Sequence, residues 1–484
     1  GGEKNLVMPS ASCVANLNPL LEGYKEAAML NPIYDPLYVI DVNETRYYLA
    51  DSYEVSEDGM QITVKLKEGL KWHDGEAITA DDMIFTMDVC SDTNNGAGGT
   101  NIVILNDQPV KYEKVDDLTV KVTLPMASAS YADLLGGLTL IPEHVFEGNP
   151  SVVSAGEANM KGIGSGPYKV TEFKQDEYLL LEKYEDYYMG APSIDKVTFR
   201  IISDLSAQEV ALMNGEVNFM ELANAPAVAK YEADPNFTVV KYPEGRVNYL
   251  AVNKFCETVQ DPKVVEAVFA ALNRDEIIAG AYGDGMAESA NSIFSNVNTF
   301  YDPSVEGYTQ DVEKAKQLVK ETGLDSKTLT LYFNSERVYM KESAQIIQQQ
   351  LKNVGINLEV IPLESAGFFE KVFGTDGDYE FYLNGYGAVG DPDQVVAGMY
   401  DGTWGVNLAV SDEVSQLWKD ARTVYTPEER AAIYKQIQIQ TRDELTCYPI
   451  AYPNYVFVTT SNIKGADTIK RTPVFEDYTK LTME

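Results

Sequence analysis

The stretch from Thr328 to Asp393 constrains the fold most strongly, because apolar residues recur in it first with strand periodicity and then with helix periodicity. Three strands and two helices are expected to alternate there, at 328–333, 340–354, 356–360, 365–373 and 378–384. A β-α-β-α-β order predicts a parallel sheet with crossover helices, and ligands of such sheets lie beyond the carboxyl ends of the strands.

Polar residues follow two of these predicted strand ends. Arg337 lies beyond the first strand, and the loop "GYGAVGDPD" at 385–393 lies beyond the third. Its glycines allow close approach of a ligand to the backbone, and Tyr386, Gly387 and Asp391 are predicted to form one wall of a binding pocket. The alternative is a long surface turn.

The composition excludes several classes of protein. A chain of 484 residues is expected to form two or three domains. Its formal net charge of −36 disfavours nucleic acid or an anionic membrane as a partner, and a solvated acidic surface explains the charge. No apolar run approaches the roughly 18 residues of a membrane span. The opening "GGEKNLVMPSAS" has no export signal, which leaves the compartment undecided.

Cysteine and histidine usage makes a structural zinc site improbable, and no cofactor is expected. The chain has four widely spaced cysteines and two histidines. In an extracytoplasmic setting the cysteines allow three disulfide connectivities, whereas Cys90 lies in an amphipathic helical pattern and is equally well explained as a buried thiol. The cysteines are Cys13, Cys90, Cys256 and Cys447.

Two short motifs resemble catalytic or nucleotide-binding signatures but lack the required context. His73 could act as a base with Asp74, yet a histidine in a tight Asp-Gly turn is better explained as a hydrogen-bonding residue of that turn. Glycines at 162, 164 and 166 resemble a dinucleotide loop, but Pro167 replaces the helix start that such a loop needs.

Many segments along the chain, in order, resemble the extracytoplasmic solute-binding proteins, family 5, of ABC importers, which include oligopeptide-, dipeptide- and nickel-binding proteins. The resemblance covers nearly the whole chain and is more specific for the family than for the ligand. It is carried by "LADSYEVSEDGMQITVKLKEGLKWHDGEAITADDMIF", "IPEHVF", "GIGSGPYKV", "ALMNGEVNF", "YLAVN", "AALNRDEII", "DVEKAKQLVKETG", "AQIIQQQLKNVGINLEV" and "GYGAVGDPD".

The resemblance implies an α/β, two-lobed periplasmic-binding-protein-like fold, class II of the cluster C type, with an extra subdomain inserted in the first lobe. Lobe I would comprise 1–40, 165–250 and 460–484, the inserted subdomain 41–164, and lobe II 251–459. The protein would be a monomer whose lobes close by a hinge motion over a ligand.

The resemblance also implies ligand contacts. Arg337 falls where dipeptide binders of the family hold the ligand carboxylate, and a guanidinium beside a helix N-terminus suits that role. A surface arginine paired with Glu336 or Glu342 is the alternative. Glu22, Gly23 and Tyr24 precede a helix expected at 25–33 and resemble the first-lobe ligand loop, and Trp404 and Asn407 are further expected contacts.

One departure from the family bears on the ligand. Peptide binders use an aspartate near "GYG…GDPD" to neutralise the ligand's amino terminus, and here Gly387, Ala388 and Val389 occupy the nearest positions. Asp391 or Asp393 is the remaining candidate for that anchor, and the departure puts a peptide with a free amine in doubt.

The function expected is that of a non-enzymatic, extracytoplasmic binding protein that passes a short peptide to an ABC permease and is held at the membrane by a lipid anchor or free in a periplasm. An oligosaccharide is the alternative ligand, since Trp404 and 31 tyrosines supply stacking faces, and a metal chelate ranks below it. A hydrolase using Asp391 and Asp393 is the alternative from another class, but their spacing across a proline gives little reason for converging acids.

Overall fold

The computed structural model describes residues 2–23, 26–42, 44–401, 407–468 and 475–484. It divides into two compact units: unit 1 is Gly1–Tyr242 with Tyr455–Glu484, and unit 2 is Pro243–Asn454. Both units combine strands with helices, so the α/β class is confirmed. The division of the first lobe into two parts stays a prediction.

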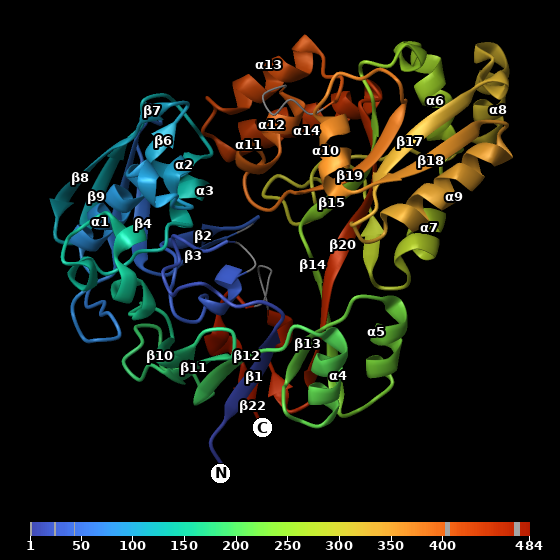
Figure 1. The fold of residues 1–484 in the computed structure, drawn as a ribbon. Helices are drawn as coiled ribbons and strands as arrows, with labels where there is room; N and C mark the ends of the chain where they lie inside the picture. The colour runs from blue at the N-terminus through green and yellow to red at the C-terminus, as the bar shows by residue number, and fades with distance from the viewer. Residues whose placement is uncertain (1, 24–25, 43, 402–406, 469–474) are drawn as a thin grey trace. The chain divides into compact units, whose positions relative to one another are not determined.

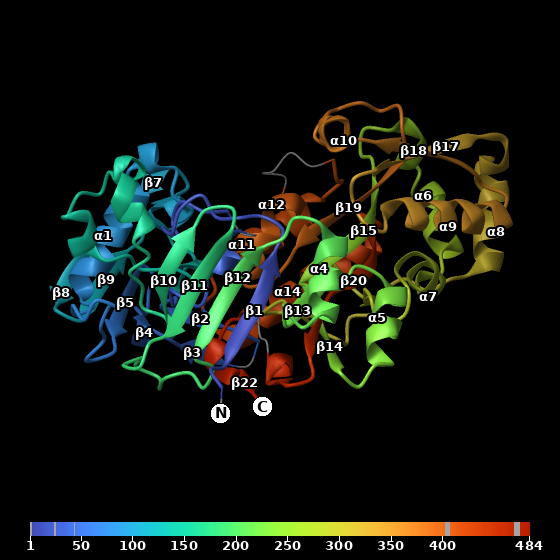
Figure 2. The same ribbon diagram turned by 60° about the horizontal axis from the view of Figure 1, so that its bottom comes forward.

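The described residues of unit 1 form two four-stranded sheets. In the first, β1 pairs in parallel with β12, and β12, β11 and β10 pair antiparallel; Figure 2 shows them side by side. These strands are β1 (Asn5–Ser10), β12 (Lys196–Ile201), β11 (Tyr178–Lys183) and β10 (Tyr168–Lys174). The second sheet is antiparallel, in the order β4 (Ala50–Val55), β5 (Gln61–Leu66), β9 (Thr119–Thr123) and β8 (Lys111–Asp116).

The remaining elements of unit 1 are short. Three two-stranded ribbons are formed by β2 (Tyr38–Ile40) with β3 (Thr45–Tyr47), β6 (Ile104–Leu105) with β7 (Gln108–Pro109), and β21 (Ile463–Lys464) with β22 (Thr482–Met483). Two further strands, β13 (Phe219–Glu221) and β14 (Phe237–Pro243), pair with the long strand described below. The helices are α1 (Ala80–Ser91), α2 (Thr100–Val103), α3 (Tyr131–Gly136), α4 (Leu205–Met213) and α5 (Ala225–Glu232).

A buried carboxyl group lies inside unit 1. The hydroxyls of Tyr187 and Tyr188 both donate to Asp35 Oδ2, at 2.6 and 2.5 Å, and the Asp35 amide donates to Ser165 Oγ at 3.0 Å. Burial raises the pKa of Asp35 to about 7, although both tyrosine hydrogen bonds act to lower it. Desolvation of the charged form therefore outweighs the two hydrogen bonds.

The glycine-rich segment near residue 164 packs against other backbone instead of enclosing a phosphate. A side chain at Gly164 would collide with the carbonyl oxygen of Ile33, and one at Gly166 would lie 2.6 Å from the carbonyl oxygen of Pro32. His73 fastens this segment, because its Nδ1 accepts from the Gly164 amide at 3.1 Å and its Nε2 lies 2.9 Å from the Gly166 carbonyl. His73 is a hydrogen-bonding residue, as predicted, but its ring binds a segment 91 to 93 residues further along the chain instead of its own turn. Burial lowers its pKa to about 4.

The sheet of unit 2 contains the predicted parallel run. Strand β17 (Thr328–Asn334) pairs in parallel with β18 (Asn357–Leu363) on one side and with β19 (Phe381–Gly387) on the other. Next to β19 lies β15 (Arg246–Val252), antiparallel, followed by β20 (Cys447–Thr460); β16 (Ala287–Ser289) also pairs with β20. The parallel topology is thus confirmed, and the carboxyl ends of β17 and β19 lie at the same edge as the start of β15.

Helices cover this sheet (Figure 1). The longer helix of the predicted run packs on β17, β18 and β19, and the shorter one contacts β17 and β18. The helices of unit 2 are α6 (Pro262–Ala271), α7 (Arg274–Ile277), α8 (Val312–Thr322), α9 (Met340–Asn353), α10 (Ser365–Val372), α11 (Pro392–Val395), α12 (Ala397–Tyr400), α13 (Asp412–Ala421) and α14 (Pro427–Asp443).

Two elements differ from the sequence prediction. In place of a helix at 25–33, the structure has one 3₁₀ turn at Glu26–Met29 among the residues described there; Pro32 disfavours a helical conformation at Asn31. Strand β20 begins at Cys447, earlier than the predicted start at 454, because the sheet tolerates Pro449 and Pro453, with a register shift opposite Asn248 and Tyr249.

Candidate ligand-binding residues

The turn after β17 presents Arg337 to solvent. Buried Asn334 organises the turn, since its Oδ1 accepts from the Glu336 amide at 3.0 Å and its carbonyl accepts from the Arg337 amide at 3.2 Å. The Glu336 carboxylate accepts from the Ser365 amide at 3.1 Å. Within the part of the chain that the structure describes, the Arg337 guanidinium makes no ion pair or side-chain hydrogen bond, so the expected alternative of a pair with Glu336 or Glu342 is not formed.

Arg337 lies close to the N-terminus of α9. The N-cap residue of this helix is Tyr339, which has a left-handed φ of +73° and supplies no side-chain cap. The first amides of a helix carry partial positive charge, and without a cap they are available to an anion. The Tyr339 ring stacks on Tyr282, with centroids 4.2 Å apart and an interplanar angle of 27°.

A second arginine, Arg246, reaches the same region from the start of β15. In the antiparallel pairing Arg246 lies opposite Gly387, and Asn248 lies opposite Gly385. A Cβ at Gly385 would lie 3.1 Å from Arg246 Nη2 and would collide with Asn248 Oδ1, so Gly385 makes room for these two side chains. The Asn248 amide donates to the Tyr282 hydroxyl at 2.8 Å.

The charge of Arg246 is not neutralised by a direct contact. Burial lowers the pKa of its guanidinium; Glu244 acts to raise it, and the charge of Arg337 lowers it further. No ion pair or hydrogen bond joins this guanidinium to another residue among those described. Within the described part of unit 2, two guanidinium groups therefore lie near each other and near an uncapped helix N-terminus without an ion pair.

Glu22, of the predicted first-lobe loop, braces its own segment. Its carboxylate accepts from the Asn16 amide at 2.8 Å, and Gly23 is exposed. Tyr24 and Trp404 lie outside the described residues.

Tyr386 points into the core of unit 2. Successive residues of a strand face opposite sides of the sheet, so Tyr386 faces away from Gly385 and Gly387. Its hydroxyl donates to the Ile293 carbonyl at 2.5 Å and lies 3.0 Å from the Tyr400 hydroxyl. Gly387 is exposed opposite Arg246. The ring of Tyr386 thus supports the strand that carries the glycines.

Asn407 is fully buried and acts as a hydrogen-bonding hub. Its Oδ1 accepts from the Lys254 amide at 2.9 Å, and its Nδ2 donates to the Tyr379 hydroxyl at 3.1 Å and to Asn253 Oδ1. Its carbonyl accepts from the Tyr382 hydroxyl at 2.9 Å. These contacts satisfy the amide within unit 2 and give Asn407 a role in the fold.

Both candidate amine anchors are held by arginines of unit 2. Asp391 makes a buried, two-pronged ion pair with Arg430, at 2.6 and 3.0 Å, and caps α11. Asp393 accepts from Arg422 Nε at 2.6 Å. The two carboxylates therefore hold the loop after β19 to helices α13 and α14, and their negative charges face arginines instead of a ligand amine.

Sequence reasoning missed Arg246, Tyr282 and Tyr339. A signal for the first was available: Arg246 is the one charged residue in the otherwise uncharged strand "RVNYLAV". The two tyrosines had no such signal, because their stacking depends on the left-handed backbone at Tyr339.

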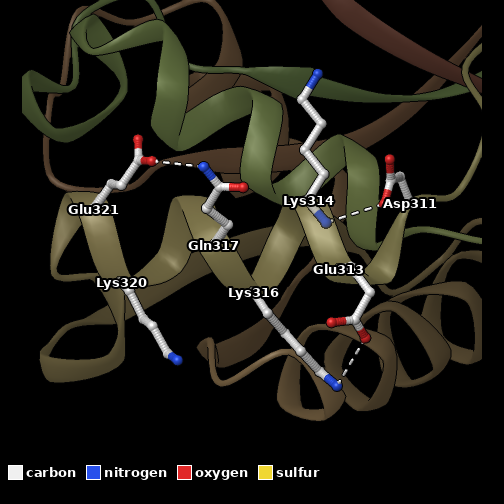
Figure 3. Close-up of a pocket in the computed structure, with 7 residues that line it drawn as sticks. All are labelled: Asp311, Glu313, Lys314, Lys316, Gln317, Lys320 and Glu321. Carbon is white, nitrogen blue, oxygen red and sulfur yellow. Dashed lines mark hydrogen bonds and ion pairs between the residues drawn. The ribbon is translucent and has the colours of Figure 1, made fainter.

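A hollow on the outer face of α8 has a different character (Figure 3). It is lined by Asp311, Glu313, Lys314, Lys316, Gln317, Lys320 and Glu321. Several of these side chains contact one another along the helix, as in the Lys316–Glu313 ion pair at 3.6 Å and the Gln317–Glu321 hydrogen bond at 2.9 Å. This is a solvated helix face with mixed charges.

The described residues contain no group of three or more histidine, cysteine or acidic side chains arranged to hold a metal ion. In the same residues, no helix combines the length and apolar character needed to cross a bilayer. All four cysteines are described and free, and Cys90 is buried, as one of the two interpretations of the sequence predicted.

The family model for bacterial extracellular solute-binding proteins, family 5, matches residues 44–407. The chain belongs to this family, which confirms the resemblance seen in the sequence, and its role is that of a substrate-binding protein.

Individual relatives agree with this. The chain is 27% identical to the dipeptide-binding protein of Escherichia coli (strain K12), over 96% of this chain and 92% of that protein. The crystal structure of the ABC transporter substrate-binding protein CtaP of Listeria monocytogenes matches with a TM-score of 0.90 and 33% identity over the full length of both chains. The oligopeptide-binding protein AppA of Bacillus subtilis, solved with a nonapeptide, matches with a TM-score of 0.71 and 25% identity, also over both full chains.

Proposed function

We propose that this protein binds short peptides outside the cytoplasm and delivers them to the permease of an ABC importer. The observation that carries the peptide assignment is Arg337, an exposed and unpaired guanidinium at the uncapped N-terminus of α9, suited to a ligand carboxylate. Relatives named for dipeptide and oligopeptide binding support the same ligand class.

Further parts of the proposal follow from the family. The protein acts as a monomer without catalysis, and a lipid anchor or a periplasm keeps it near the permease. The arginine partners of Asp391 and Asp393 support the absence of catalysis, because a carboxylate neutralised by a guanidinium is a poor general acid or base.

Of the predicted ligand contacts that the structure describes, four are proposed to touch the ligand: Glu22, Gly23, Gly387 and Arg337. Tyr386, Asp391 and Asn407 are instead proposed to support the strand and loop around Arg337, because their polar atoms are bound within unit 2.

A thermal-shift screen tests the ligand class. Di- to hexapeptides, oligosaccharides and nickel chelates would be compared, since a ligand at 100 times its Kd stabilises the folded state by about 2.7 kcal/mol. We expect a rise in Tm with peptides that Arg337→Ala removes. Arg200→Ala is the matched control, because Arg200 is a partly exposed arginine of unit 1 that pairs with Glu216 at 3.5 Å. A shift with sugars alone would contradict the peptide assignment.

A further inference from the structure

The two arginines lie on the same side of the unit 2 sheet. Arg246 and Asn248 are two residues apart on β15 and face the same side, and both lie over Gly385. Asn248 binds Tyr282, Tyr282 stacks on Tyr339, and Tyr339 follows Arg337 by two residues. This chain of contacts connects the guanidinium of Arg246 to the turn that carries Arg337.

The position of Arg246 is unfavourable in the absence of an anion. A partly buried charge loses hydration, and here no described residue compensates it by an ion pair or hydrogen bond. A like charge, Arg337, is near enough to disfavour its protonated form. Structural arginines elsewhere in unit 2 are paired, as Arg430 is with Asp391 and Arg422 with Asp393.

Arg246 and Arg337 place two guanidinium groups in the region of the N-terminus of α9, and Glu244 acts on Arg246 from within electrostatic range. A ligand carboxylate in this region would be attracted by both guanidinium groups.

We propose that Arg246 is a second carboxylate-binding residue, and that Arg246 and Arg337 together select ligands with a free C-terminal carboxylate. This inference rests on the proposed function and deepens it, because it specifies which end of the peptide unit 2 holds. Two guanidinium groups can each donate to the same carboxylate, so loss of either one weakens binding by about 10- to 100-fold.

Calorimetric titration with three tripeptides tests the selection. The probes are Ala-Ala-Ala, its C-terminal amide, and Ala-Ala-Glu amide, which carries only a side-chain carboxylate. We expect wild-type protein to prefer Ala-Ala-Ala over its amide by at least about 10-fold, and Arg246→Met to lose most of this preference. Arg246→Lys keeps the positive charge but lacks the planar guanidinium, so it should retain only part of the preference for Ala-Ala-Ala over its amide. Arg200→Met is the control that leaves the preference unchanged.

The stability of the ligand-free protein separates binding from a structural role. If Arg246 serves the ligand, Arg246→Met removes an uncompensated charge and leaves the Tm of the free protein unchanged or raised. A lower Tm for Arg246→Met than for Arg200→Met would overturn the inference.

The results of the titrations also distinguish failure of this inference from failure of the proposed peptide-binding function. Peptide binding by wild-type protein with equal affinity for acid and amide, or with no effect of Arg246→Met, would refute the inference and leave the proposed function intact. Preference for Ala-Ala-Glu amide over Ala-Ala-Ala would assign the arginines to a side-chain carboxylate and refute the C-terminal selection. Absence of peptide binding by wild-type protein would refute the proposed function itself.

Discussion

The buried pair of Arg430 and Asp391 gives the sharpest prediction about stability. Both side chains are less than one-tenth exposed and meet through two hydrogen bonds of 2.6 and 3.0 Å. Arg430 also donates to the Tyr434 hydroxyl at 2.9 Å and lies over the Phe300 ring. The substitution Arg430→Met keeps most of the aliphatic stem but removes the two-pronged ion pair with the buried Asp391 carboxylate.

The expected cost follows from the loss of this buried ion pair. Removing one member of a buried ion pair typically costs about 3–5 kcal/mol. For a domain of the size of Pro243–Asn454, each kcal/mol lowers Tm by roughly 2–4 °C, so Arg430→Met should lower the Tm of this unit by about 6–20 °C.

Differential scanning calorimetry with three variants checks this reasoning. The double variant Arg430→Met/Asp391→Asn removes both charges while keeping an oxygen to cap α11, and it should be more stable than Arg430→Met alone. Lys316→Met breaks the exposed 3.6 Å pair with Glu313 (Figure 3) and should change stability by less than about 0.5 kcal/mol. A loss below about 1 kcal/mol for Arg430→Met would refute the argument.

Three further predictions concern unit 1. Because the pKa of Asp35 is raised from 3.8 to about 7, its contribution to stability is complete below pH 3.8 and is lost as the pH rises towards 7. Urea unfolding should therefore show Asp35→Asn gaining stability relative to wild type, by up to about 4 kcal/mol, between pH 4 and 7; a constant difference would contradict this. The imidazole of His73 should titrate near pH 4 in proton NMR, with His73→Gln identifying its resonance, and titration near 6.5 would show that burial does not control it. Gly164→Ala should lower stability by several kcal/mol, because the added Cβ collides with backbone atoms of Ile33. The control Gly367→Ala, which has open space in α10 of unit 2, should raise stability by about 0.5–1 kcal/mol. Equal effects of the two substitutions in chemical denaturation would show that the contact with Ile33 relaxes.

Local sequence patterns were sufficient to predict most elements of unit 2. Alternating and helical periodicities gave the parallel run, and short-range signals fixed several helix ends. Asp261 caps α6 with Pro262 as its first residue, and Gly323 ends α8 with a φ of +69°. These features depend on residues within one or two helical turns of each other, which is the range that a sequence pattern reports.

The candidate site was predictable only in part, because its other features depend on distant partners. Arg337 could be placed from the strand that precedes it. The ion pair of Asp391, in contrast, depends on Arg430, 39 residues later, and the burial of Asn407 depends on Asn253. The start of β20 at Cys447 was not predicted, because Pro449 favours a turn in the local sequence and the sheet overrides that preference.

The path of the chain through β20 has a consequence for the order in which the protein can fold during synthesis and export. Unit 1 is interrupted after Tyr242 and resumes at Tyr455, and its strand β13 pairs with Phe457–Thr459. All of unit 2 must therefore leave the ribosome or the export channel before unit 1 can complete this pairing. Unit 2 has no such dependence, because the Glu244 amide already binds the Pro453 carbonyl at 3.0 Å and holds its two ends together. Until the residues from Tyr455 onward are available, the amino-terminal part of unit 1 stays incompletely folded. This segment is therefore the part of the chain that a chaperone or protease would bind first.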